Sequence, residues 1–159
     1  MFGRIRVTMV TEGAAGVPLA GFASTAHAGL LSLATGSCGL QASQPLSQWG
    51  DFNYYTQVPG GTFESGSPSW LLGGGAKVVS WNESYDVAGP WSHSLGLPAG
   101  SSASSPPACT GIDHPSARLF VRNTGSSSSR LNVWATYPLL LGIPYTAYLG
   151  QISGSSSWQ

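Results

Sequence analysis

The acidic and histidine side chains that could support acid–base chemistry are few and scattered. Away from the N-terminus they are Asp51, Glu64, Glu83, Asp86, Asp113, His93 and His114. Two carboxylates can act as acid and base in glycoside hydrolysis, but no spacing along this chain selects a pair. His114 lies in a turn-like Asp-His-Pro sequence, yet no Gly-x-Ser-x-Gly motif supplies a nucleophile. The sequence therefore predicts a protein that is not an enzyme, with a glycoside hydrolase as the alternative.

The segment from Trp81 to Trp91 combines aromatic rings with polar side chains in one loop-like stretch. Sugar rings present apolar C–H faces that stack on aromatic side chains, and their hydroxyl groups need polar partners. This segment is therefore the predicted ligand-binding patch. The expected contacts are Trp81, Asn82, Glu83, Tyr85, Asp86 and Trp91. Core packing is the alternative, and it is the stronger interpretation for Trp70 and Trp134.

Composition limits the classes of protein that need to be considered. The chain has 159 residues, enough for one domain with its own core, and 42% of them are hydrophobic. Charged residues make up only 8% and the net charge is zero, so no basic surface is expected to bind nucleic acid. No segment approaches the roughly 20 apolar residues of a membrane-spanning helix. We expect neither nucleic-acid binding nor a membrane span.

Short β-prone segments separated by Gly, Pro and Ser indicate the fold class. Strands are predicted over residues 62–64, 70–72, 76–81, 93–97 and 145–152, with a hairpin formed by residues 117–123 and 130–137. No stretch has the periodicity of an amphipathic helix of normal length. One apolar and one mixed face on each hairpin strand suits packing between two sheets. The pattern predicts an all-β, two-sheet antiparallel β-sandwich.

The N-terminal region resembles a secretory signal peptide. Arg4 and Arg6 precede a mostly small and apolar run that ends in an A-x-A pattern, Ala26-His27-Ala28. We predict a signal peptide over residues 1–28, with cleavage near Gly36 or a disordered start as alternatives. Residues 29–57 are then an N-terminal arm and residues 58–159 the sandwich domain. The expected location is secreted or on the cell surface.

Two cysteines, Cys38 and Cys109, fit an exported protein. An oxidising compartment favours a disulfide between them. The bridge would close a loop of about 70 residues and stabilise the fold by about 4 kcal/mol in the chain-entropy description. Two free thiols are the alternative.

Three blocks of sequence resemble a known group of proteins. They are residues 58–64 (VPGGTFE), residues 97–103 (LPAGSSA) followed by Cys109, and residues 118–123 (RLFVRN). In this order they are similar to uncharacterised secreted actinobacterial proteins over about residues 38–159. The first block also resembles the opening strand of jelly-roll carbohydrate-binding modules and galactose-binding-like domains. The resemblance implies a secreted jelly roll that binds a polysaccharide or cell-wall glycan.

The resemblance also bears on Glu64 and on the end of the sheet. In related jelly rolls the equivalent Glu helps to bind a structural Ca²⁺, whereas loop amides or solvent satisfy it in the alternative interpretation. Such domains usually close with a strand carrying an acidic pair, and no such pair precedes Gln159. The sandwich is therefore expected to lack its last strand, either because the reading frame is truncated or because an uncovered sheet edge pairs with another chain. This second case defines the alternative function, a structural or self-assembling surface protein.

Overall fold

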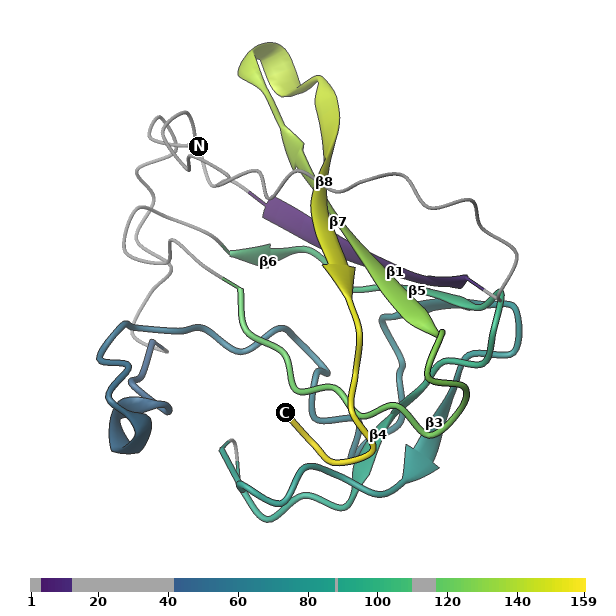
Figure 1. The fold of residues 1–159 in the computed structure, drawn as a ribbon. Coiled ribbons are helices and arrows are strands. Elements are labelled where there is room, and N and C mark those ends of the chain that lie inside the picture. The colour runs from purple at the N-terminus through teal and green to yellow at the C-terminus, as the bar shows by residue number, and fades with distance from the viewer. Residues whose placement is uncertain (1–3, 13–41, 88, 110–116) are drawn as a thin grey trace.

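The computed structural model describes residues 4–12, 42–87, 89–109 and 117–159 (Figure 1). This part of the chain consists of strands and loops, with two 3₁₀ turns, η1 (Ser47–Trp49) and η2 (Leu140–Gly142). None of its helical turns has the length and hydropathy of a membrane-spanning helix. The all-β prediction is confirmed. The strands are β1 (Arg4–Glu12), β2 (Leu71–Gly73), β3 (Lys77–Ser80), β4 (His93–Gly96), β5 (Ser102–Ser104), β6 (Ala108–Cys109), β7 (Arg130–Pro138) and β8 (Pro144–Ile152).

Six of these strands form one antiparallel sheet. Its order is β2-β5-β1-β7-β8, and β6 pairs with the first residues of β1. β1 lies in the middle, between β5 along one edge and β7 along the other. β3 and β4 form a separate two-stranded sheet at the lower end of the molecule in Figure 1. The fold therefore consists of small antiparallel sheets joined by loops rich in Gly, Pro and Ser.

β7 and β8 form a long hairpin whose loop extends past the rest of the described chain (Figure 1). Aromatic and β-branched residues on both strands favour this extended pairing. The register shifts by one residue between Val133, which faces Gly150, and Trp134, which faces Tyr148. Leu149 is the extra residue of this β-bulge, and a bulge increases the local twist of a strand pair.

The buried hydrophobic side chains of the described residues are mostly small. Ala103 on β5 and Val133 and Ala135 on β7 flank the central strand, and the backbone of Met9 faces both Ala103 and Val133. Asn132 is also buried, and its Oδ1 accepts hydrogen bonds from the Tyr148 hydroxyl at 3.1 Å and Gln151 Nε2 at 3.0 Å. Those bonds satisfy a polar group that would otherwise be costly to bury.

The predicted strand over residues 62–64 is wrong. Phe63 has a positive φ of 61° and lies between two turns, in which its N–H donates to Gly60 and its carbonyl accepts from Gly66. The flanking glycines adopt positive φ at low cost, so turn chemistry overrides the β-propensity of Thr62 and Phe63. Phe63 is nevertheless buried, with its ring centroid 5.0 Å from that of Trp70. The contact agrees with the core packing expected for Trp70, which is half-buried.

The predicted pairing of residues 117–123 with residues 130–137 is also wrong. Both edges of β7 are occupied, by β1 and by β8. Residues 121–123 instead lie beside the C-terminal tail, where Val121 and Gln159 exchange backbone hydrogen bonds of 3.0 and 3.1 Å. The Asn123 N–H donates to the carbonyl of Ser155 at 2.6 Å. Long partner strands therefore displace the local hairpin that the sequence indicates.

The N-terminal predictions are not decided by the fold. Arg4–Glu12, inside the predicted signal peptide of residues 1–28, forms β1. The signal peptide stays a prediction, which N-terminal sequencing of the exported protein would test. Cys38 lies outside the described residues, and so does the predicted disulfide. The described part of the predicted arm contains η1 and one backbone bridge between Ser43 and Tyr55.

Candidate functional site

An arginine held between two tryptophan rings forms the centre of the candidate site. The guanidinium carbon of Arg122 lies 5.5 Å from the ring centroid of Trp81 and 5.5 Å from that of Trp158. Guanidinium groups stack on aromatic faces in this way, and each contact fixes both partners. The three side chains come from the end of β3, from the segment beside the tail, and from the tail itself. They bring together positions 81, 122 and 158 of the chain.

Three further rings extend this centre. The Tyr85 hydroxyl donates to the carbonyl of Trp158 at 3.0 Å, and the Tyr85 ring lies 5.4 Å from Phe120 and 5.9 Å from Trp49, centroid to centroid. The contact with Trp49 is edge-to-face, a favoured geometry for aromatic pairs. Four segments of the chain thus meet on one surface. We call this set the aromatic–arginine platform, and its members are Trp49, Trp81, Tyr85, Phe120, Arg122 and Trp158.

Trp81 is the most exposed tryptophan of the platform and its backbone is strained. The residue is 68% exposed and has a φ of 139°, which residues other than glycine rarely adopt. Its N–H donates to the carbonyl of Ser92 at 2.7 Å, which ties the end of β3 to the start of β4. Such strain costs on the order of 1–3 kcal/mol and is maintained only where the surroundings enforce it. The fold therefore holds a tryptophan in solvent against both hydrophobic and backbone preferences.

Glu83 has a structural role in the loop that follows Trp81. It is buried, and its two carboxylate oxygens accept hydrogen bonds from the N–H groups of Tyr85 and Val87, the second at 3.0 Å. The carboxylate therefore satisfies the loop backbone and positions Tyr85 in the platform. Asp86 is exposed and Asn82 half-buried, beside this loop. Of the predicted ligand contacts, Glu83 and Tyr85 have side-chain oxygens that form hydrogen bonds within the protein.

Trp91 is placed differently from the platform. It is 40% exposed and lies directly over Gly89, where a Cβ atom would come within 3.1 Å of the indole. Gly89 also has a φ of 123°, so only glycine fits there without strain. The described ring contacts of the platform do not include Trp91. The described contacts therefore join Trp81 and Tyr85 of the predicted patch, and the indole of Trp91 lies beside Gly89.

A second polar cluster links the turn at Phe63 to the start of β4. The carboxylate of Glu64 accepts hydrogen bonds from the backbone N–H of Ser92 and of His93, both at 2.7 Å. It also contacts the Ser92 hydroxyl at 3.2 Å and His93 Nδ1 at 3.0 Å. These bonds, led by that with the His93 side chain, lower the pKa of Glu64 from 4.5 to about 2. Glu64 is therefore ionised at neutral pH and fastens two distant segments together.

This Ser–His–Glu cluster does not have the geometry of a catalytic triad. In a triad the acid holds one imidazole nitrogen and the serine contacts the other. Here the Ser92 hydroxyl, at 3.1 Å, and Glu64 both contact Nδ1 of His93. His93 is therefore not positioned to pass a proton from Ser92 across its ring, and the cluster acts as a structural link.

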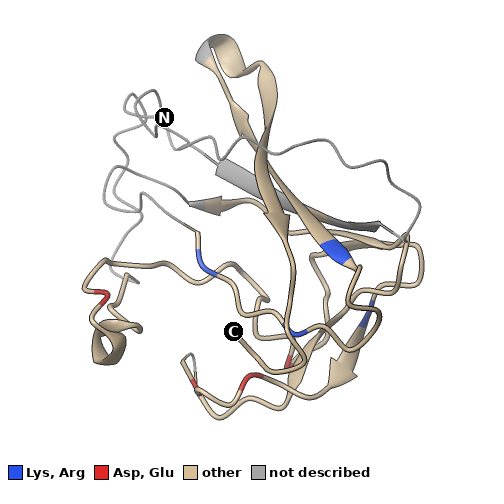
Figure 2. Cartoon of the chain, in the orientation of Figure 1, with Lys and Arg blue, Asp and Glu red and all other residues tan. Residues whose placement is uncertain are grey.

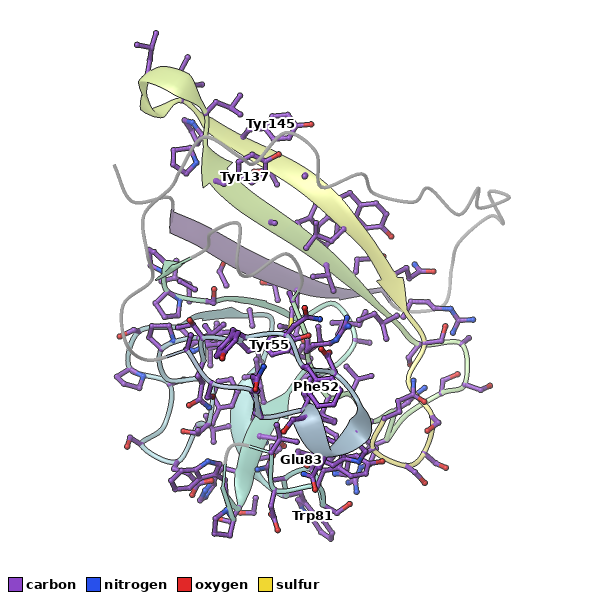
Figure 3. The ribbon with its side chains drawn as sticks, turned by 90° about the vertical axis from the view of Figure 1, so that its left-hand side faces the viewer. Phe52, Tyr55, Trp81, Glu83, Tyr137 and Tyr145 are labelled. Atoms are coloured by element: carbon purple, nitrogen blue, oxygen red, sulfur yellow. The ribbon has the colours of Figure 1, made fainter. Side chains whose placement is uncertain are left out.

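Asp51 makes a comparable anchor for the segment that carries Trp49. Its carboxylate accepts hydrogen bonds from the Tyr55 hydroxyl at 2.6 Å and from Asn53, and it pairs with Arg118 at 3.4 Å. These partners, the Tyr55 hydroxyl first, lower the pKa of Asp51. Figure 3 shows Tyr55 and Phe52 on this segment, between the sheet and the end of the molecule that carries Trp81 and Glu83. Asp51 thereby holds η1 against residue 118, close in sequence to Phe120 and Arg122.

The calcium interpretation of Glu64 stays a prediction. Within residues 4–12, 42–87, 89–109 and 117–159, no three His, Cys, Asp or Glu side chains gather at a point where they could hold a metal ion. The four hydrogen bonds at Glu64 match instead the alternative in which loop groups satisfy the carboxylate. A Ca²⁺ ion would have to compete with those donors for the same oxygens.

Four platform residues were missed by the sequence prediction: Trp49, Phe120, Arg122 and Trp158. Part of the signal was present, because Phe120 and Arg122 are two residues apart and share a face in an extended chain. The C-terminal tail had no recognisable partner in the sequence. Its pairing with residues 121–123 is a long-range contact that local patterns do not encode.

Comparison with known proteins adds no identification. No protein-family model matches the chain. Searches of the curated proteins and of the solved structures also returned no match. The resemblance to secreted actinobacterial jelly-roll proteins therefore stays a prediction, and functional inference depends on the site itself.

Proposed function

We propose that this protein is a non-catalytic glycan-binding module whose ligand stacks on the aromatic–arginine platform. The observation that carries the proposal is Trp81, which is 68% exposed while Arg122 is stacked on its ring. An exposure this large leaves much of the indole surface open to a ligand. A pyranose ring offers the apolar C–H face that such a surface accepts.

Arg122 supplies the polar half of the recognition. Its guanidinium carbon lies 5.5 Å from the ring centroids of both Trp81 and Trp158, and the group carries five N–H donors. Among the described residues no acceptor forms a hydrogen bond with this guanidinium. Its donors can therefore bond to the hydroxyl groups of a sugar that lies on Trp81. Exposed Asp86 adds an acceptor on the neighbouring loop.

The proposal includes a two-sheet jelly roll as the architecture that presents the platform. The separate β3–β4 sheet at one end of the larger sheet supports this arrangement. The turn at Phe63 and the link from Glu64 to His93 join the two parts. A secreted or cell-surface location would give such a module access to polysaccharides and cell-wall glycans.

A glycan array followed by pull-down on insoluble polysaccharides tests the proposal. Wild-type protein is expected to bind at least one neutral polysaccharide, and Trp81→Ala and Arg122→Ala are expected to weaken that binding roughly tenfold. Trp91→Ala asks whether the second predicted tryptophan takes part, and a small effect is expected because Trp91 packs over Gly89.

The matched control is Tyr145→Ala, which removes a ring that is 48% exposed at the far end of the molecule (Figure 3). It should leave glycan binding unchanged. Wild-type protein that binds no sugar would reject the proposal, as would equal losses in Trp81→Ala and Tyr145→Ala.

A second candidate is self-assembly through a sheet edge. β8 ends the described order of the larger sheet and exposes most of its nine residues. An unpaired edge strand of this length can pair with another chain. Size-exclusion chromatography with light scattering should then give oligomers whose fraction rises with concentration. A monomer at high concentration would reject self-assembly, and it would not bear on the glycan-binding proposal.

A further inference from the structure

The loop of the β7–β8 hairpin exposes apolar side chains where the chain projects farthest from the sheets. Leu139 is 49% exposed, Leu141 94% and Ile143 58%, and Pro138 and Pro144 frame them. Both views of the fold show this loop extending away from the rest of the described chain (Figures 1 and 3). We call residues 138–144 the hairpin tip. Because the tip projects and its described side chains are exposed, it can reach an apolar phase without the rest of the molecule.

The side chains below the tip change polarity in layers. Tyr137 and Tyr145 face each other directly below the prolines, with ring centroids 5.5 Å apart. In the next pair the hydroxyls of Thr136 and Thr146 are 2.9 Å apart and hydrogen-bonded. Tyrosines at the boundary between apolar and polar layers are typical of proteins at membrane interfaces. The order along the hairpin is thus apolar tip, tyrosine pair and hydroxyl pair.

The hairpin tip closes part of its own backbone hydrogen bonding. The Leu139 N–H donates to Ile143 at 2.8 Å, and the Gly142 N–H donates to Leu139 at 3.0 Å. Pro138 and Pro144 have no N–H to satisfy. Backbone groups without partners are costly in hydrocarbon, so a self-bonded loop is suited to shallow insertion.

Leu141 is an unexpected residue at the end of this loop. Its φ of 66° and ψ of 13° are left-handed, a conformation that Gly or Asn adopts with less strain. It also has almost no contact with the rest of the protein, being 94% exposed. Packing and backbone preference therefore both disfavour leucine here. Backbone strain at an exposed residue of this kind points to a function for the side chain.

The absence of charged residues from the hairpin tip favours an apolar partner such as a bilayer over a charged one. The sequence from residue 131 to residue 159 contains no Asp, Glu, Lys, Arg or His. Figure 2 shows the charged residues that it colours away from the loop of the hairpin, and Arg130 is the first residue of β7. Charge complementarity with an anionic surface is therefore absent, and any attraction must come from apolar burial alone.

We infer that the hairpin tip inserts into the outer layer of a lipid bilayer and holds the protein at the membrane surface. Tyr137 and Tyr145 lie one pair below the prolines that frame the tip, so only residues 138–144 extend beyond the tyrosine pair. Peripheral proteins bury their apolar side chains about 5–10 Å below the head groups. The tyrosine pair then lies at head-group level, and the threonine pair lies farther from the bilayer, in water.

Vesicle flotation tests this inference with full-length protein and phosphatidylcholine vesicles. Wild-type protein is expected to float, with equal binding when phosphatidylserine is added and in high salt, because the hairpin has no charge. Leu141→Asp is expected to lower the bound fraction roughly tenfold or more. Leu141→Asn replaces the apolar side chain with one that tolerates the left-handed conformation. This variant should therefore stay folded but lose vesicle binding.

Leu71→Asp is the matched control, since Leu71 is 61% exposed on β2 and lies outside the hairpin tip. It should float like the wild type. Binding that requires phosphatidylserine, or that Leu141→Asn leaves intact, overturns the inference. So does light scattering that shows a dimer which Leu141→Asn dissociates, because the tip would then contact a second copy. The outcome is independent of glycan binding, which Leu141→Asn should not change.

Discussion

The two ends of this molecule both expose aromatic and apolar side chains, but they hold them in different ways. The aromatic–arginine platform is assembled from four segments, with Arg122 between Trp81 and Trp158. The hairpin tip is one continuous loop between neighbouring strands, and the tyrosine rings directly below it pair across the two strands. Figure 3 shows Trp81 near one end of the molecule and Tyr137 and Tyr145 near the other.

This difference has chemical consequences. At the platform Trp81 and Trp158 have the cationic neighbour Arg122, and the Tyr85 hydroxyl donates to a carbonyl, which suits a ligand that has both C–H faces and hydroxyl groups. At the hairpin tip the neighbours of Leu141 are apolar, and the nearest polar side chains pair with each other. Exposed apolar surface alone therefore does not define a function, and the chemistry of its immediate neighbours separates the two proposals.

The largest expected effect concerns the packing that supports the platform end. Phe63→Ala should lower the free energy of unfolding by about 3 kcal/mol, because it removes a buried ring that contacts Trp70. Urea denaturation followed by tryptophan fluorescence measures this. Leu71→Ala, at an exposed leucine nearby in the chain, should change stability by less than about 0.5 kcal/mol. Equal losses would mean that Phe63 is not a core residue.

Arg122→Ala should separate the two ends functionally. Glycan affinity is expected to fall roughly tenfold, because Trp81 and Trp158 lose the cation that fixes both rings. Arg122→Lys should recover only part of the loss, since an ammonium group lacks the planar guanidinium. Flotation with vesicles should be unaffected by either change. Arg130→Ala serves as control, because Arg130 bonds only to carbonyls of the preceding turn among its described contacts.

Acid should affect the ends unequally. The pKa of Glu64 is lowered to about 2, so its ionised form is favoured by folding. Its contribution to stability is complete above the unfolded value of 4.5 and is lost as the pH falls toward about 2. Thermal unfolding between these limits should show a decline that is shallower in Glu64→Gln. Vesicle binding should stay constant wherever the protein is folded, since the hairpin tip has no group that titrates there.

The smallest expected effect is a gain in stability from Leu141→Asn. Asparagine accepts the left-handed backbone of residue 141, so the free energy of unfolding should rise by up to about 1 kcal/mol. Differential scanning calorimetry would record a melting temperature a few degrees higher. A fall in stability would show that Leu141 is held by packing against the protein, and would contradict its description as an exposed, strained residue.

Local patterns predicted the strands that depend on local chemistry. β3, β4, β7 and β8 lie close to the predicted ranges 76–81, 93–97, 130–137 and 145–152. The strand predicted at Phe63 was wrong, because the effect of Gly60 and Gly66 on the backbone outweighed its β-propensity. Strand boundaries and pairing partners depend on which strand edges are already occupied, and local sequence patterns do not encode that.

The candidate site was predicted in part for the same reason. Trp81 and Tyr85 were found because they lie in one segment with a clear chemical character. Arg122 and Trp158 were missed because their relation to Trp81 exists only after the tail pairs with residues 121–123. The hairpin tip was also missed as a surface, since a run of leucines does not reveal whether it is covered.

The central position of β1 has a consequence for the order of folding. Its Thr8 is paired on one side with Ser104 and on the other with Trp134, so its contacts wait until most of the chain has been made. Sheets closed by pairings this distant in sequence form slowly, because the entropy cost of closing the loop comes before the contacts stabilise the sheet. The β3–β4 pair and the β7–β8 hairpin can form earlier from neighbouring segments. A newly made chain would thus have its β3–β4 pair and its β7–β8 hairpin before it has its larger sheet, whereas the platform waits for Trp158 in the tail. β1 would join last although it was synthesised first.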